Sequence, residues 1–353
     1  MKDAGHREAV RAALEFEDCG RTPVNNFAVV TSARYAGVTV NQARNDPDLS
    51  ARVAVDFAMR TESDFVKPVL DSQVPLADMG LPVRFPEDDY GSVPGHTVDT
   101  AEDIDRLHVF DPDNASECPG FTTVRQALER TEAILEEDLH ICGLSWGPIT
   151  TAGYFMGAEN MLFGMLDQGD LVKRMISKSA ELVSVMERAM VASGASLMWM
   201  ADPTSSEDLI SPGMFDEFSR EHIKRVIDDV KRDYDVTNFV HICGNTLDTI
   251  AHMKGTGADC LSFDHAVDPA KARGAAGRDL ALMGNVDPVK YVMLGTPEQV
   301  RDQSYRVIEA AGREGGLILA PGCETPIASP FENVLALGRA GRDYWTRRWF
   351  IYR

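Results

Sequence analysis

One histidine and two cysteines are residue types that hold transition metals, and each follows a short apolar run. His241 and Cys243 lie in Phe239-Val-His-Ile-Cys-Gly, and Cys323 lies in Leu319-Ala-Pro-Gly-Cys-Glu, eighty residues after Cys243. A three-ligand set leaves one position of a tetrahedral ion open, which is typical of catalytic rather than structural zinc. The alternative interpretation is a core histidine with two ordinary buried cysteines, because Cys323 is distant in sequence from the other two.

The same four letters, His-Ile-Cys-Gly, occur again at His140–Gly143. A second metal site there needs its own distant ligand, for which Cys118 is the nearest candidate. We interpret the repeat, which contains Cys142, as chance or as lining of the same mouth of the fold that holds His241 and Cys243, and we expect Cys118 to be an ordinary small residue.

The elements that must position these ligands are short apolar, β-rich runs, most of them followed by a helical stretch. In Met214–Arg232, for example, apolar residues recur at helical spacing. Eight strands that alternate with helices predict an α/β fold, specifically a (β/α)8 TIM barrel. The eight predicted strands are Asn26–Val30, Asp64–Leu70, Leu139–Leu144, Ser196–Ala201, Thr237–Ile242, Asp259–Phe263, Leu280–Met283 and Gly316–Ala320.

Two segments depart from a minimal barrel. The first twenty residues predict an N-terminal helical extension outside the barrel. Residues 73–119 are rich in Pro, Gly and Asp, and we interpret them as an insertion after the second strand that covers one mouth of the barrel. No domain boundary stands out, so residues 1–353 are expected to form a single domain.

The barrel prediction gathers polar residues at one place. Active sites of such barrels lie at the carboxyl ends of the strands. His241 and Cys243 end the fifth predicted strand, Cys323 follows the eighth, and Asp202 and Asp264 end the fourth and sixth. This gathering favours the metal interpretation.

Composition restricts the function classes. Formal net charge is −20, from 55 acidic and 35 basic residues, which argues against a nucleic-acid-binding surface. The six cysteines have no framework spacing, the first residues are polar, and no apolar run approaches a membrane span. We therefore expect a cytoplasmic protein that binds neither nucleic acid nor membrane.

In order along the chain, a set of motifs resembles the uroporphyrinogen decarboxylase superfamily, and within it the branch of zinc-dependent corrinoid methyltransferases. The likeness is specific as a set between about residues 140 and 335. The motifs are Gly147-Pro-Ile-Thr, Met156-Gly-Ala-Glu-Asn, Ala201-Asp-Pro-Thr, Asp208-Leu-Ile-Ser-Pro, His241-Ile-Cys-Gly-Asn, Leu282-Met-Gly-Asn-Val-Asp-Pro, Gly295-Thr-Pro-Glu, Leu319-Ala-Pro-Gly-Cys and Ser329-Pro-Phe-Glu-Asn.

The resemblance implies a zinc ion on His241, Cys243 and Cys323. It also implies a fourth, displaceable acidic ligand near the end of the next strand, for which Asp264 is the candidate and the adjacent His265 an alternative.

Other polar residues at the mouth are candidates for supporting roles. We expect Asp202 and Asn245 to orient ligands or acceptor in catalysis, with structural hydrogen bonding as the alternative for each. Corrinoid-contacting candidates, which equally fit a helix N-terminus packed on the barrel, are Trp146, Met156, Glu159 and Asn160.

The implied function is methyl transfer between a corrinoid (methylcobalamin) held by a partner corrinoid protein and a small-molecule acceptor, most simply a zinc-activated thiol such as coenzyme M. The reverse direction, from a methylated or methoxylated donor to Co(I) corrinoid, is an alternative. A decarboxylase-like enzyme and a non-catalytic corrinoid-binding protein are others. The decarboxylase carries an arginine-rich N-terminal motif, whereas the matching Thr31–Gly37 has only Arg34, which disfavours a polyanionic tetrapyrrole.

Overall fold

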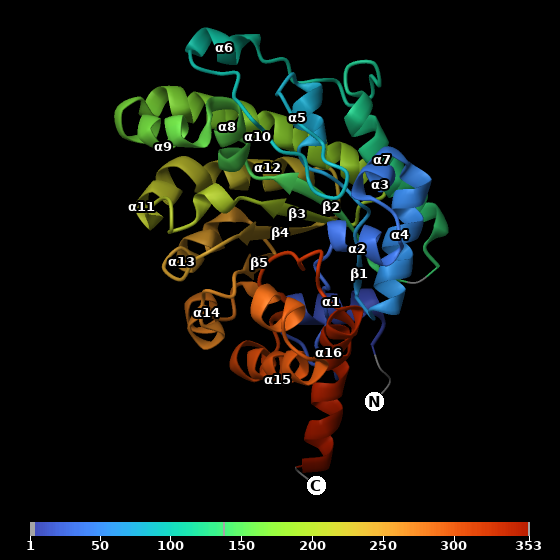
Figure 1. Cartoon of the computed structure of the whole chain (residues 1–353). Helices are drawn as coiled ribbons and strands as arrows, with labels where there is room; N and C mark the ends of the chain where they lie inside the picture. The colour runs from blue at the N-terminus through green and yellow to red at the C-terminus, as the bar shows by residue number, and fades with distance from the viewer. Residues whose placement is uncertain (1–3, 137, 352–353) are drawn as a thin grey trace.

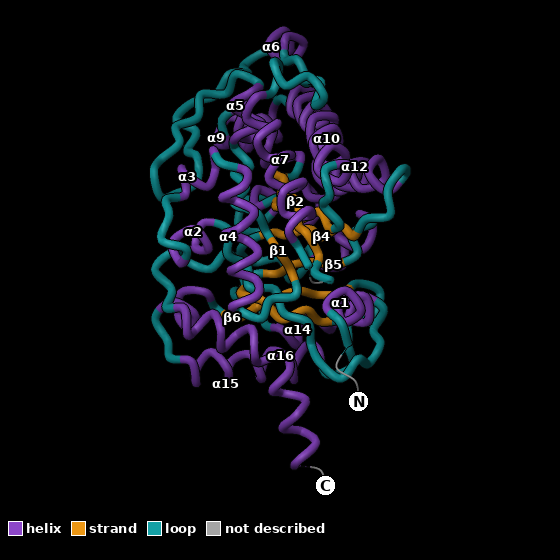
Figure 2. The backbone as a smooth tube through the Cα atoms, turned by 90° about the vertical axis from the view of Figure 1, so that its right-hand side faces the viewer, coloured by secondary structure: helices purple, strands orange, loops and turns teal. Residues whose placement is uncertain are grey.

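A parallel sheet of seven strands lies at the centre of the molecule, surrounded by helices (Figures 1 and 2). This computed structural model describes residues 4–136 and 138–351. Strands adjacent in sequence are adjacent in the sheet, in the order β1 to β7. The strands are β1 (Phe65–Val66), β2 (His140–Trp146), β3 (Leu197–Ala201), β4 (Thr237–Ile242), β5 (Cys260–Phe263), β6 (Ala281–Val286) and β7 (Leu317–Pro321).

An irregular segment closes the sheet into a TIM-type barrel. The strand predicted at Asn26–Val30 is wrong: the pairing residue is Val24, which forms a single parallel bridge with Leu319 of β7. The Asn25 N–H donates to the Leu319 carbonyl at 2.8 Å, and the Asp64 N–H donates to the Val24 carbonyl at 2.8 Å. The apolar run after Val24 is buried without being a strand, and such short runs do not distinguish the two cases. The second predicted strand is likewise shorter than expected, because only β1 pairs within it.

The barrel interior is filled by side chains that alternate along the strands. One cluster of buried residues joins this interior to the helix α1 (His6–Leu14), which therefore packs against the barrel as the predicted extension. Its main members are Val10, Ala13, Phe65, Cys142, Leu197, Trp199, Phe239, Cys260, Ala281, Met283, Ile318 and Ala320.

The helices pack on the outside of the sheet through apolar stripes. In α12, Ile223, Val226, Ile227 and Val230 are buried at helical spacing. The remaining helices are α2 (Val30–Tyr35), α3 (Val40–Asn45), α4 (Pro47–Arg60), α5 (Val74–Asp78), α6 (Ala101–Arg106), α7 (Pro119–Ile134), α8 (Pro148–Met156), α9 (Ala158–Asp167), α10 (Gly169–Ala192), α11 (Pro212–Phe215), α12 (Glu221–Lys231), α13 (Ile250–Met253), α14 (Pro269–Ala276), α15 (Pro297–Val307) and α16 (Phe331–Ile351). Short 3-10 or π-helical turns are η1 (Pro203–Ser205), η2 (Asp216–Arg220), η3 (Lys254–Thr256), η4 (Pro288–Met293) and η5 (Ile308–Gly312). Within the described ranges, no helix combines the length and apolarity that a membrane crossing needs.

The insertion after the second predicted strand contains α5 and α6 and one antiparallel bridge between Arg84 and Ser92. It is fastened to the barrel by buried polar contacts. Asp71, just beyond β1, forms an ion pair with Arg44 of α3 at 3.0 Å and accepts the Gly91 N–H at 2.7 Å. The insertion therefore starts from the carboxyl end of β1 and returns to it.

Candidate metal centre

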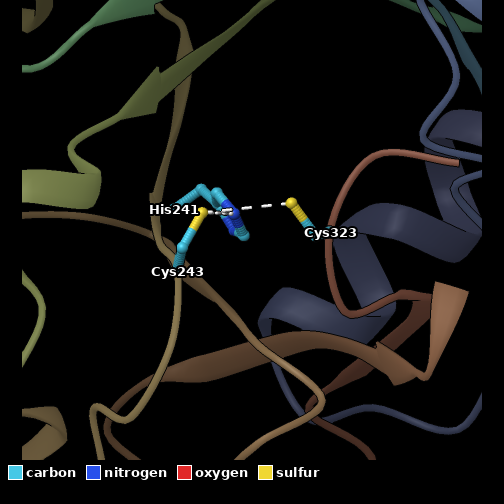
Figure 3. Close-up of side chains that lie close together, drawn as sticks. All are labelled: His241, Cys243 and Cys323. Carbon is cyan, nitrogen blue, oxygen red and sulfur yellow. Dashed lines mark hydrogen bonds between the residues drawn. The ribbon is translucent and has the colours of Figure 1, made fainter. Parts of the chain in front are cut away.

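His241, Cys243 and Cys323 come together at the carboxyl ends of β4 and β7 (Figure 3). Their ligand atoms all lie within 4.8 Å of one another. His241 Nε2 is 3.2 Å from Cys243 Sγ, and the two Sγ atoms are 3.9 Å apart. The histidine is buried and both cysteines are partly exposed, so a small molecule can reach the sulfur atoms. The grouping predicted from the sequence is present.

Local backbone geometry explains how residues two positions apart face one point. His241 lies on the same inward face of β4 as Phe239, and the strand ends at Ile242. Gly244 then adopts φ +71°, and a Cβ there would lie 2.0 Å from Asp208 Oδ2. Only glycine fits this turn, which directs Cys243 back toward His241.

The β7 loop is held against the rest of the mouth by close packing. A Cβ on Gly322 would lie 2.3 Å from the His265 backbone nitrogen, so the loop that carries Cys323 touches the loop after β5. The next residue, Glu324, accepts hydrogen bonds from the Val29 and Val30 N–H groups at 2.9 and 3.1 Å, at the start of α2. Its second oxygen accepts from Tyr90 of the insertion.

The imidazole of His241 is oriented by a partner on β5. Its Nδ1 lies 2.9 Å from the buried Ser262 hydroxyl, which leaves Nε2 toward the sulfur atoms. Metal-binding histidines in general have such a partner on the second ring nitrogen.

The Cys243 and Cys323 thiols contact each other and shift each other's pKa in opposite directions. The hydrogen bond from Cys243, followed by the neighbouring His241, holds the pKa of Cys323 well below its ordinary value. The same bond, together with burial, raises the pKa of Cys243 above its ordinary value.

The spacing fits a tetrahedral ion such as Zn²⁺. With Zn–S bonds of about 2.3 Å and a Zn–N bond of about 2.0 Å, the tetrahedral S–S and N–S separations are about 3.8 and 3.5 Å. The distances of 3.9 and 3.2 Å between these atoms match within a few tenths of an ångström. Among the described residues no carboxylate oxygen joins the group, so an ion held by these three residues would keep its fourth corner open.

Asp264 and His265, the candidates for a fourth ligand, contact each other. Asp264 Oδ1 is 2.7 Å from His265 Nδ1 and accepts the Ala266 N–H at 2.9 Å. Asp264 is buried, whereas His265 lies toward solvent. Its role as fourth ligand stays a prediction.

The residues predicted to orient ligands are engaged in local hydrogen bonds. Asp202 is fully buried, and its carboxylate accepts from the Thr150 N–H at 2.9 Å and the Ser205 hydroxyl at 3.1 Å. Asn245 is exposed and donates to Glu207 at 3.1 Å. Both side chains tie loops at the mouth together.

The predicted corrinoid-contacting residues do not form one cluster. Trp146, at the end of β2, is partly buried with its ring 5.7 Å from that of Tyr154. Met156 is buried, whereas Glu159 and Asn160 are exposed on α9. Their contact with corrinoid stays a prediction.

The rival cysteine motif is separate from the metal group. Cys142 is buried inside the barrel on β2, where burial raises the pKa of its thiol to about 12. Cys118 is buried at the start of α7, outside the barrel.

Sequence reasoning missed three polar residues near the group: Ser262, Lys67 and Glu324. Lys67 follows β1 and is buried, with its amine 3.6 Å from the Trp199 ring centroid and 4.0 Å from that of Phe27. A lysine within the apolar run Phe65–Leu70 was the available signal, because buried lysines are rare without a partner.

The family model for uroporphyrinogen decarboxylase (URO-D) matches residues 6–344, and the chain belongs to this family. It is 30% identical over 254 residues to the methylcobamide:CoM methyltransferase MtbA of Methanosarcina mazei, covering 72% of this chain and 71% of that protein. It is also 28% identical over 310 residues to a uroporphyrinogen decarboxylase of Nostoc punctiforme, covering 84% of each. The fold matches a solved methyltransferase from Methanosarcina mazei with a TM-score of 0.87, at 24% identity over 97% of this chain and 99% of that chain. Relatives are thus both methyltransferases and decarboxylases.

Proposed function

We propose that this chain is a zinc-dependent methyltransferase that transfers a methyl group from a methylated corrinoid, held by a partner protein, to a thiol such as coenzyme M. The supporting observation is the group of one imidazole and two sulfur atoms with an open fourth corner. Decarboxylation of a tetrapyrrole carboxylate has no use for two soft sulfur donors, whereas activation of a substrate thiol does. The similarity to a methylcobamide:CoM methyltransferase points the same way.

The residues of this chain would act as a rigid holder. Zn²⁺, when bound by His241, Cys243 and Cys323, would lower the pKa of a substrate thiol and present it as a thiolate. Ser262 fixes the imidazole, and the Glu324 contacts fix the loop that carries Cys323. The partly exposed cysteines keep the open corner at the mouth, where a large methyl donor can approach.

The transfer itself is a displacement at carbon. The substrate sulfur attacks the methyl carbon, so that the S–C bond forms while the Co–C bond breaks, and the electron pair of the broken bond stays on cobalt. The protein contributes alignment of sulfur, carbon and cobalt, which replaces a chance encounter in solution.

A single preparation of the whole chain tests the proposal. Metal content is measured first, and loss of the methyl–cobalt absorbance of methylcobalamin is then followed with coenzyme M, 2-mercaptoethanol and tetrahydrofolate. We expect about one zinc per chain and thiol-dependent demethylation. Zinc with demethylation of a methylated donor onto Co(I) corrinoid instead would reverse the proposed direction, and turnover of a porphyrinogen that survives chelation would replace the proposal.

A further inference from the structure

Lys67 is a buried amine without a hydrogen-bond partner, close to the metal group. Within the described part of the chain its Nζ has no donor or acceptor partner, and the residue is 9% exposed. Buried cations in proteins are paired with anions or coordinate other groups, because leaving water is costly for a charge. A lysine kept here without a partner therefore requires an explanation.

The surroundings of Lys67 connect it to the metal group without direct contact. Its amine lies 4.0 and 3.6 Å from the ring centroids of Phe27 and Trp199, which stack on each other with centroids 4.2 Å apart. Both rings in turn flank His241, with centroids 6.1 Å from the imidazole. The aromatic faces attract a cation and partly replace its lost hydration. The amine is thus one ring away from a metal ligand.

The charge of the proposed centre changes when substrate binds. Zn²⁺ with two cysteine thiolates and a neutral imidazole is uncharged, and a substrate thiolate at the open corner makes it singly negative. Burying that extra negative charge costs free energy unless a cation lies nearby. Lys67 is a buried cation whose two ring partners, Phe27 and Trp199, both lie beside His241.

We propose that Lys67 is the counter-charge of the thiolate-bound metal centre, a positioning residue that makes the open corner select an anionic sulfur ligand. This inference rests on the proposed function. In the metal-free protein, burial lowers the pKa of Lys67 to about 7, and the charge of nearby Glu324 offsets this only in part. Glu324 makes no hydrogen bond with the amine, because its carboxylate accepts from Tyr90 and two backbone N–H groups instead.

The test uses the whole chain loaded with Co²⁺, whose sulfur-to-metal absorption bands report thiolate binding directly. Coenzyme M, which carries a sulfonate, and 2-mercaptoethanol, which carries no charged tail, are titrated into the parent protein, Lys67→Met and Lys67→Gln. We expect equal Co²⁺ content and about tenfold weaker affinity for both thiols in both variants, from the Coulomb energy of charges several ångströms apart in a partly shielded site.

The unfolding temperature is a second measurement. If Lys67 had a purely structural role, its removal would lower this temperature. Removing an unpaired buried ammonium should leave the unfolding temperature of metal-free Lys67→Met unchanged or higher. A lower unfolding temperature with unchanged thiol affinity would show that the lysine only anchors the two rings.

The remaining outcomes are also decisive. Weakened binding of coenzyme M alone would overturn the counter-charge role and place the sulfonate at Lys67 instead. Normal binding of both thiols in the variants would overturn the Lys67 proposal and leave the proposed function intact. No thiolate band in the parent protein would overturn both.

Discussion

Buried charges such as Asp64 form ion pairs at the amino-terminal end of the barrel, whereas the thiols and Lys67 at the carboxyl-terminal end have no ion-pair partner among the described residues. Before β1, Asp64 binds Arg21 at 2.6 and 2.9 Å and His6 at 2.8 Å, all largely buried. A cleft of about 1200 Å³ opens at this end, and ion pairs such as Lys231–Asp259 line it. At the other end, the Cys243 and Cys323 sulfur atoms lie 3.9 Å apart, and Lys67 has no hydrogen-bond partner among the described residues.

The difference separates charges that stabilise the fold by pairing with each other from groups that remain available to bind a ligand. A buried ion pair with every lone pair satisfied is a structural solution, because each charge stabilises the other. Thiols and an amine without such partners are stable only with a ligand that completes them, or at a cost in stability. The cleft of about 1200 Å³ lies at the end where the charges are already paired, so the presence of a cleft does not by itself identify the reactive end.

Removal of a metal ligand should have the largest effect. We expect Cys243→Ala or Cys323→Ala to lose the metal and to reduce methyl transfer by at least about a hundredfold, because two ligands cannot hold the ion in place. Metal analysis and the methylcobalamin assay measure this, and circular dichroism should show an intact barrel. Cys118→Ala, a buried cysteine outside the barrel, is the matched control; full metal content in either ligand variant would refute the assignment.

The paired end should respond in stability and not in metal binding. Asp64→Ala leaves Arg21 buried without its carboxylate, and we expect a loss of about 3–5 kcal/mol in the free energy of unfolding. Urea denaturation measures the loss, and zinc content should equal that of the parent at temperatures where both are folded. Unequal zinc content would mean that the two ends are coupled.

The same carboxylate predicts a pH dependence. Burial raises the pKa of Asp64, but the bonds from His6 and Arg21 outweigh burial and hold it below its ordinary value. The stabilisation is therefore present above the ordinary aspartate pKa, about 4, and is lost as pH falls through the folded value. The stability difference between parent and Asp64→Ala should shrink in urea titrations below about pH 4. A constant difference would contradict the pairing.

Loss of the imidazole partner should be smaller. Ser262→Ala leaves His241 Nδ1 unpartnered, and we expect metal affinity to fall about tenfold. Competition with a chromophoric chelator measures the affinity. Ser304, a buried serine on α15, provides the control, and Ser304→Ala should bind metal as the parent does. Equal metal affinity in Ser262→Ala and Ser304→Ala would show that Ser262 does not support the site.

Loss of one hydrogen bond between the insertion and Glu324 should have the smallest effect on metal affinity. Tyr90→Phe removes one hydrogen bond to Glu324, beside Cys323, and we expect metal affinity to fall about threefold, in line with the net contribution of one hydrogen bond. The same chelator competition applies. Tyr35→Phe, which removes a hydrogen bond to Ser329, is the control.

The ligand group was predictable because residue type and strand ends carry the information. His241, Cys243 and Cys323 are soft donors after apolar runs, and the barrel brings strand ends together. The interactions of Ser262, Lys67 and Tyr90 with the site were not predictable, because serine, lysine and tyrosine occur for many reasons. Their roles depend on which neighbour lies across the barrel. The strand predicted at Asn26–Val30 was wrong for a similar reason. Phe27 and its neighbours are buried without pairing with another strand, and an apolar run alone does not distinguish these two cases.

The bridge between Val24 and Leu319 of β7, which we call the seam, links closure of the barrel to formation of the group of His241, Cys243 and Cys323. Cys323 lies four residues beyond Leu319, which pairs across that seam, while the other ligands come from the middle of the chain. A complete ligand set exists only after the last strand has met the first segment, so an ion that binds the set favours the closed barrel by its binding energy. A bound ion would therefore stabilise the closed barrel in addition to its proposed role in the reaction, and a strong chelator should increase amide hydrogen exchange along this seam.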